Sequence, residues 1–258
     1  MFLTCQSVCK TIRHSPILKN VSLTMHGGAI YGLEGKKGSG KTILMKLLCG
    51  LIYPSSGWIE IDGLRHVSLL PSTGVLFEKS AFIPGETGFK NLEMINALAN
   101  TPISKEEIRA TLRQVGLGDN DPRPYRKFSP GMQQRLGIAA AIMGFPRLVV
   151  LDKPTTSLGS DGILLMRKIC TQLKKHGCLV VLSCHDSEEL YLLCDFIFSM
   201  KDGEIAGAQH KTAGGEWIDM EEKNVSRCSF KSNQHFGYTD FYSKHEVACT
   251  GTDKNSCR

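Results

Sequence analysis

Eight residues at positions 35–42, GKKGSGKT, have the spacing of a phosphate-binding loop, G-x-x-x-x-G-K-[ST]. Glycines let backbone N–H groups converge on phosphate oxygens, and a helix that begins at the loop adds the positive end of its dipole. Lys41 is expected to reach the β- and γ-phosphates of a nucleotide, and the Thr42 hydroxyl is expected to bind Mg²⁺. The motif therefore predicts a nucleotide site formed by Gly35, Lys36, Lys37, Gly38, Ser39, Gly40, Lys41 and Thr42.

A carboxylate that suits the same chemistry, Asp152, follows the apolar run LVVL at positions 148–151. Ligands collect at the C-terminal ends of buried strands in open α/β sheets. In phosphate-loop enzymes an aspartate at such a place helps to hold Mg²⁺. Thr42 and Asp152 are therefore the expected metal-binding residues.

The elements that must position these residues alternate between strands and helices. We expect strands at 17–25, 29–33, 58–61, 148–151 and 178–183, and helices at 41–49, 105–115, 160–177 and 187–194. Ser104 with Glu107 forms a capping box, and Ser129 caps a further helix that has Pro130 at its first position. This alternation implies a largely parallel sheet with helices on its faces.

Composition and charge limit the kinds of partner that this chain is expected to have. A net charge of +6 without a dense lysine and arginine stripe argues against a nucleic-acid partner. Ten scattered cysteines without a C-x-x-C pair favour a reduced, cytoplasmic compartment. The longest apolar stretch, residues 136–151, is interrupted by Pro146 and Arg147 and is too short to span a bilayer. Any membrane work therefore needs a separate transmembrane partner.

The order of these segments resembles that of the ABC transporter ATPases over roughly residues 2–205. The phosphate loop is followed by FSPGMQQR at 128–135, by LVVLDKP at 148–154 and by His185 after a strand. Three segments are similar in sequence to the bacitracin- and lantibiotic-resistance branch of exporters: GSGKTILMKLLCGLIYPSSG, TGFKNLEMI and SPGMQQRLGIAAAIM. The resemblance implies an α/β fold: a P-loop NTPase core with a mostly parallel sheet, an antiparallel β edge and an inserted helical subdomain at about 85–145.

The same resemblance implies a nucleotide-binding domain over residues 1–207 that works as a head-to-tail pair, with ATP sandwiched between two chains. Ser129 and Gly131 match the signature residues that touch the partner's γ-phosphate, and Ser129 also begins a helix, where anions bind. His185 matches the switch histidine that holds the γ-phosphate. Glu78 stands where most of the family has a glutamine that senses the metal and contacts the membrane partner. Residues 208–258 are expected to be a polar appendage of unknown function.

Three residues depart from the family's pattern. Lys153 replaces the glutamate that polarises the attacking water, and a lysine side chain, protonated at neutral pH, cannot accept a proton. Gly159 replaces an aspartate that crosses to the partner chain. Ile12 falls where many relatives place an aromatic residue under the adenine. The chain's own half-site is therefore altered, while its signature half is intact.

Three functions stay open at this point. The first is an ATP-binding subunit that couples ATP binding and hydrolysis to export through a separate membrane permease, on the inner face of the plasma membrane. The second is a hydrolysis-deficient partner in an asymmetric pair, which Lys153 and Gly159 favour. The third is a soluble ABC ATPase in translation or chromosome maintenance, which usually carries tandem domains or a long coiled coil. Whether the pair is a homodimer or a heterodimer, and what it exports, stays open as well.

Overall fold

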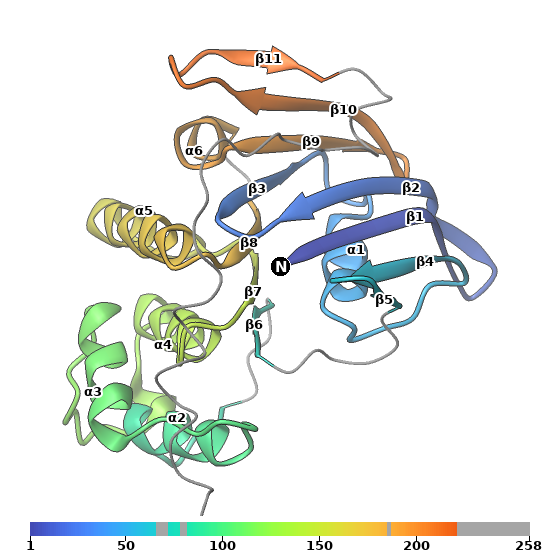
Figure 1. Cartoon of the computed structure of the whole chain (residues 1–258). Helices are drawn as coiled ribbons and strands as arrows, with labels where there is room; N and C mark the ends of the chain where they lie inside the picture. The colour runs from blue at the N-terminus through green and yellow to red at the C-terminus, as the bar shows by residue number, and fades with distance from the viewer. Residues whose placement is uncertain (66–71, 78–81, 185–186, 221–258) are drawn as a thin grey trace, which may run out of the picture. The chain divides into compact units, whose positions relative to one another are not determined.

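A seven-stranded sheet forms the centre of the molecule in this computed structural model (Figure 1). The structure describes residues 1–65, 72–77, 82–184 and 187–220, all within the first of the chain's two units, Met1–Cys228 and Ser229–Arg258. The strand order is β11-β10-β9-β3-β8-β7-β6. Its strands are β3 (Ala29–Glu34), β6 (Thr73–Leu76), β7 (Leu148–Asp152), β8 (Leu179–Ser183), β9 (Phe196–Lys201), β10 (Glu204–Lys211) and β11 (Trp217–Asp219).

The sheet is parallel except at one edge. Neighbouring strands from β9 through β3, β8 and β7 to β6 run parallel, whereas β10 and β11 are antiparallel. A second, antiparallel sheet has the order β2-β1-β4-β5, with strands β1 (Phe2–Ile12), β2 (Ser15–His26), β4 (Ser56–Ile61) and β5 (Leu64–Arg65). The expected α/β class with a mostly parallel sheet and antiparallel β edges is confirmed.

Helices connect the parallel strands and pack on the sheet. The structure has α1 (Lys41–Leu48), α2 (Gly88–Ala97), α3 (Lys105–Gln114), α4 (Pro130–Ile142), α5 (Ser160–Lys175), α6 (Ser187–Leu193) and a 3₁₀ turn at Tyr125–Lys127. The helices α2, α3 and α4 fall in the segment expected to be helical. The capping box at Ser104 and the Ser129 cap with Pro130 at the first position form as the sequence predicts.

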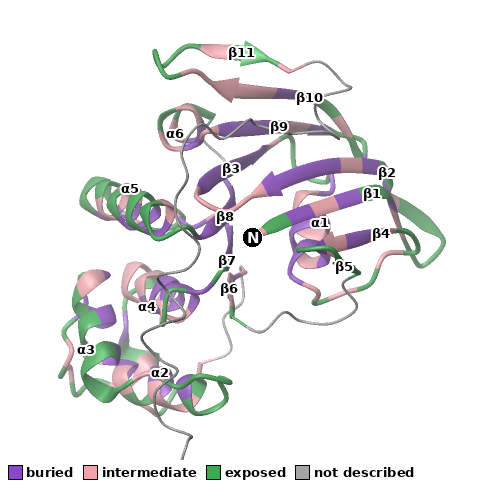
Figure 2. Ribbon diagram, in the orientation of Figure 1, coloured by how far each residue is buried: buried purple, intermediate pink, exposed green. Residues whose placement is uncertain are grey.

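The inner strands of the central sheet are buried on both faces, as Figure 2 shows for β3, β7 and β8. Because side chains alternate along a strand, Leu148 and Val150 of β7 pack into a core shared with α1 and the antiparallel sheet. Val149 and Leu151 pack into a second core shared with α3, α4 and α5. Strands buried on both faces read as continuous apolar runs, which explains why LVVL at 148–151 is recognisable in the sequence.

Gly74 in β6 is the tightest contact between the sheet and α4. A Cβ at Gly74 would lie 1.6 Å from the backbone oxygen of Ala141. A side chain at position 74 therefore fits only if the backbone of β6 or of α4 shifts. We expect Gly74→Ala to lower the free energy of unfolding by about 1–3 kcal/mol, measured by urea denaturation. Gly207→Ala in β10 is the matched control because a Cβ there meets no atom within 4 Å. Equal stability of the two variants would contradict this packing.

The sequence did not predict every strand. β1 is irregular, because Ser7 has a φ of 49° and the pairing of β1 with β2 and with β4 shifts near it. β6 is only four residues long, and β10 and β11 are polar edge strands. The expected domain boundary after residue 207 falls inside β10, and the sheet continues to Asp219 because β11 pairs with β10. The turn at Asp202-Gly203 joins β9 to β10 with positive φ at both residues.

The cysteines of the described residues are all free thiols. Most are buried, and burial raises the pKa of Cys178 to about 11 and of Cys170 to about 12. They therefore pack as small apolar side chains. Across residues 1–65, 72–77, 82–184 and 187–220, the helices are too short or too polar to cross a membrane.

Candidate nucleotide-binding site

The glycine-rich loop lies between β3 and α1, at the C-terminal end of a buried strand. Gly35 and Gly40 have φ values of 145° and 102°, in the region that favours glycine. A Cβ at Gly35 would lie 2.4 Å from the backbone oxygen of Met200, so the close approach of β9 also requires glycine. Gly40 is the N-cap of α1 and offers no side chain to its first N–H groups. Those donors and the helix dipole together suit an anion.

Lys41, the first residue of α1, folds back over the loop. Its Nζ donates hydrogen bonds to the backbone oxygens of Gly35 (2.5 Å) and Lys36 (3.0 Å) and to Ser39 Oγ (3.3 Å). Partial burial lowers the pKa of Lys41; the nearby Asp152 carboxylate opposes that shift and the Lys153 ammonium adds to it. The ammonium is therefore held at the loop by neutral acceptors, which a phosphate can replace.

Thr42 and Asp152, 110 positions apart in the sequence, meet beside the loop. Thr42 Oγ1 donates to Asp152 Oδ2 at 2.6 Å, and the buried Asp152 also accepts from Ser183 Oγ at 2.5 Å through Oδ1. β7 and β8 are parallel neighbours with Asp152 opposite Ser183, so both side chains reach the same end of the sheet. A carboxylate and a hydroxyl this close are the oxygen donors that Mg²⁺ prefers. The residues fit the metal.

Lys153 is placed directly after this carboxylate by backbone contacts. Its N–H donates to the backbone oxygen and to Oγ of Ser183, both at 3.1 Å, and its φ is 53°. Gln134 on α4 donates from Nε2 to the backbone oxygens of Lys153 (3.2 Å) and Pro154 (2.9 Å). The side chain is half-buried. The structure thus fixes the backbone of Lys153 at the position for which the family resemblance implies a catalytic glutamate.

Ser183 and Gln134 are site residues that sequence reasoning missed. Ser183 binds both Asp152 and the Lys153 backbone, and Gln134 joins α4 to the same loop. The signal for Ser183 was a polar residue that ends the apolar run LVVLS, just as Asp152 ends LVVLD. Gln134 was inside the quoted segment FSPGMQQR, but only the fold brings it to residues 153 and 154.

The two residues predicted to form the signature segment, Ser129 and Gly131, lie on another element. Ser129 is exposed and caps α4 by accepting a hydrogen bond from the Met132 N–H at 3.3 Å. A Cβ at Gly131 would lie 3.0 Å from the Ser157 backbone oxygen, so α4 approaches the loop after β7 closely. In the described part of the chain, no hydrogen bond joins Ser129 or Gly131 to the phosphate loop. Figure 1 shows α4 and α1 in separate parts of the first unit.

The remaining predicted positions are placed as follows. Glu78 and His185 lie outside the described residues. Gly159 is exposed and is the N-cap of α5, and a Cβ there would meet no atom within 4 Å. Ile12 ends β1 with 38% of its surface exposed, next to the turn at Arg13 and His14. No aromatic ring is therefore available at position 12.

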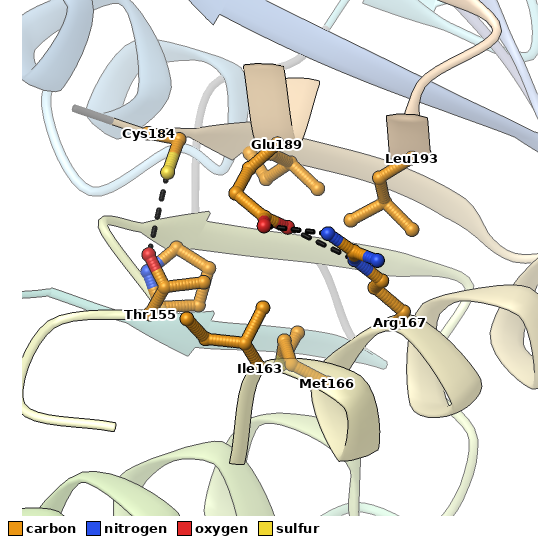
Figure 3. A pocket seen from close by; sticks show the side chains of 9 residues that line it. Thr155, Ile163, Met166, Arg167, Cys184, Glu189 and Leu193 are labelled. Atoms are coloured by element: carbon orange, nitrogen blue, oxygen red, sulfur yellow. Dashed lines mark hydrogen bonds and ion pairs between the residues drawn. The ribbon is translucent and has the colours of Figure 1, made fainter. Parts of the chain in front are cut away.

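A small pocket lies behind the loop that follows Asp152 (Figure 3). Arg167 of α5 donates from Nε (3.0 Å) and Nη2 (2.6 Å) to the carboxylate of Glu189 in α6, and Thr155 Oγ1 lies 3.3 Å from Cys184 Sγ. The pocket is otherwise lined mainly by apolar side chains, among them Ile163, Met166, Leu182 and Leu193. These contacts join α5, α6 and the end of β8, and the pocket is not part of the phosphate loop.

Comparisons with known proteins agree with this geometry. The sequence model of the family described as ABC transporter matches residues 18–156. The lantibiotic transport ATP-binding protein SrtF of Streptococcus pyogenes is 34% identical, over 79% of this chain and 88% of SrtF. The bacitracin transport ATP-binding protein BcrA of Bacillus licheniformis is 32% identical, over 86% of this chain and 75% of BcrA.

A solved structure shares the fold. The dimeric structure of MJ0796, described as a bacterial ABC transporter cassette, superposes with a TM-score of 0.74 at 24% identity, covering 81% of this chain and 98% of that one. The expected resemblance to the bacitracin and lantibiotic branch is confirmed by the relatives. The phosphate loop, the Thr42–Asp152 pair and these matches lead to one conclusion. The chain belongs to the family of ABC transporter ATP-binding proteins.

Proposed function

We propose that this chain couples ATP binding and hydrolysis to export through a separate transmembrane permease. In this proposal it pairs with a second ABC ATPase chain and is peripheral on the inner face of the plasma membrane. The contact between Thr42 and Asp152 beside the phosphate loop carries the nucleotide-binding part, because it assembles both expected metal ligands. The names of SrtF and BcrA, which transport a lantibiotic and bacitracin, support a peptide antibiotic as the exported substrate.

Each group of the site has a defined task in this proposal. The loop N–H groups and Lys41 bind the phosphates, while Thr42 and Asp152 would hold Mg²⁺, which would neutralise phosphate charge. Ser129 and Gly131 on α4 contact the γ-phosphate in the partner's site, because the N-terminus of α4 presents exposed donors. The roles of His185 with the γ-phosphate, and of Glu78 with the metal and the permease, stay predictions.

One observation favours a second candidate, a hydrolysis-deficient ATP-binding partner in an asymmetric pair. Lys153 is fixed by Ser183 and Gln134 at the place expected for the general base. Its ammonium cannot accept the proton of the attacking water. Gly159 also favours the hydrolysis-deficient candidate, because a glycine offers no carboxylate to the second chain. In such a pair this chain binds ATP, and its intact α4 completes the site at which the partner hydrolyses.

Export is tested in the host that carries the gene. Replacing the chromosomal copy with Lys41→Met is expected to lower the minimum inhibitory concentration of bacitracin or of a lantibiotic several-fold, because nucleotide binding is lost. Lys46→Met is the matched control, since Lys46 lies on the same helix with its Nζ 5.6 Å from the Phe77 ring centroid. Unchanged resistance to both classes of peptide in the Lys41→Met strain would contradict peptide antibiotic export.

A further inference from the structure

Four lysines converge on the phosphate site. Lys36 and Lys37 are exposed on the loop, Lys41 folds over it, and Lys153 follows Asp152 at the end of β7. The contact between Thr42 and Asp152 brings the phosphate loop and the end of β7 together. Lys153 therefore lies near the three lysines of the loop. The site therefore concentrates positive charge where a polyphosphate binds.

The carboxylates nearby offset only part of this charge. Asp152 carries one negative charge and accepts hydrogen bonds from Thr42 and Ser183, one on each oxygen. Glu34, at the end of β3, accepts from Ser199 Oγ of β9 at 3.2 Å. Burial lowers the pKa of Lys41, the Asp152 carboxylate opposes that shift, and the Lys153 ammonium adds to it. An anion between the two ammonium groups relieves the repulsion between them.

Hydrogen bonds hold the backbone of Lys153 in place. Its N–H donates to the backbone oxygen and to Oγ of Ser183, and its carbonyl accepts from Gln134. The first atoms of the Lys153 side chain are therefore fixed beside Asp152. In a nucleotide complex, Mg²⁺ normally supplies positive charge at this place. From a backbone held there, the Lys153 ammonium can reach the same phosphate oxygens with charge-assisted hydrogen bonds.

We propose that Lys153, together with Lys41, binds the terminal phosphate of ATP directly, so that this chain binds metal-free ATP about as tightly as the Mg²⁺ complex. This inference rests on the proposed nucleotide binding and goes beyond it. It gives Lys153 a role in ligand specificity in place of the catalytic role that its position suggests. The ligand class is a nucleoside triphosphate, with or without bound Mg²⁺.

Equilibrium binding of ATP, measured by isothermal titration calorimetry in Mg²⁺ and in EDTA, tests this role. For the wild-type chain the two dissociation constants are expected to agree within about threefold. For Lys153→Glu, the affinity for ATP in EDTA is expected to be at least about tenfold lower than in Mg²⁺. Loss of one charge-assisted hydrogen bond weakens binding by about this factor. Lys153→Gln keeps the polar stem without the charge and is expected to lose metal-independent binding too.

Lys175→Gln is the matched control because Lys175 is exposed at the end of α5, next to the start of β8 and away from the loop. Circular dichroism verifies that each variant is folded. If wild-type binding falls tenfold in EDTA, or if Lys153→Gln still binds equally in both buffers, the role given to Lys153 is wrong and nucleotide binding stands. Failure to bind ATP in either buffer would overturn the proposed function as well.

Discussion

Replacing Lys153 by glutamate is expected to raise the steady-state rate of ATP hydrolysis by the purified chain about 10²–10⁴-fold, the usual worth of a general base. The backbone of residue 153 is fixed by Ser183 and Gln134, so the new carboxylate starts from the place that Lys153 occupies beside Asp152. A carboxylate there can accept the proton of a water that attacks the γ-phosphate. The measurement is phosphate release at saturating ATP and Mg²⁺.

Lys153→Glu both removes a positive charge and provides a base, and Lys153→Gln separates these two effects. Glutamine removes the positive charge without providing a base, so no gain in turnover is expected from it. Equal gains from Lys153→Gln and Lys153→Glu would show that charge, and not the missing base, limits the rate. No gain from Lys153→Glu in a protein that still binds ATP would contradict the assignment of position 153 to catalysis.

Replacing Lys41 by methionine is expected to weaken ATP binding at least about a hundredfold, since the ammonium makes more than one charge-assisted hydrogen bond to phosphate. In the free protein its Nζ is held by the backbone oxygens of Gly35 and Lys36. Those neutral acceptors bind the ammonium less strongly than phosphate does. Binding is measured by calorimetry with ATP and Mg²⁺.

Lys46→Met is again the control for this substitution, because it removes a lysine from the same helix on the side of Phe77. Its affinity for ATP is expected to equal that of the wild type. Thermal unfolding of both variants, followed by circular dichroism, establishes that each is folded. Wild-type affinity in Lys41→Met would mean that ATP binds elsewhere on the chain.

The parts of the fold that the sequence predicts are those in which local signals agree with burial. LVVLD and LVVLS are apolar because β7 and β8 are covered on both faces. Ser104 and Ser129 form caps that depend only on residues three positions away. β1 and β11 were missed because a bulge or polar edge positions break the alternation. Their pairing depends on neighbours that are distant in the sequence.

The same distinction holds for the site. Glycine spacing identifies the phosphate loop because the backbone conformation is a local property, as the φ of Gly40 illustrates. The support of Lys153 could not be read in this way. Ser183 lies 30 positions away and Gln134 19 positions away, and only the sheet register and the packing of α4 bring them to Lys153.

In the second candidate function, the hydrolysis-deficient partner, this chain binds ATP but turns it over slowly without a competent partner. Steady-state hydrolysis and ATP binding, measured on the same purified wild-type sample, test this claim most directly. We predict saturable ATP binding with turnover close to that of a blank without protein. Turnover of about 1 s⁻¹ or more, within the usual range of enzymes, would contradict the claim and would mean that another group supplies the base.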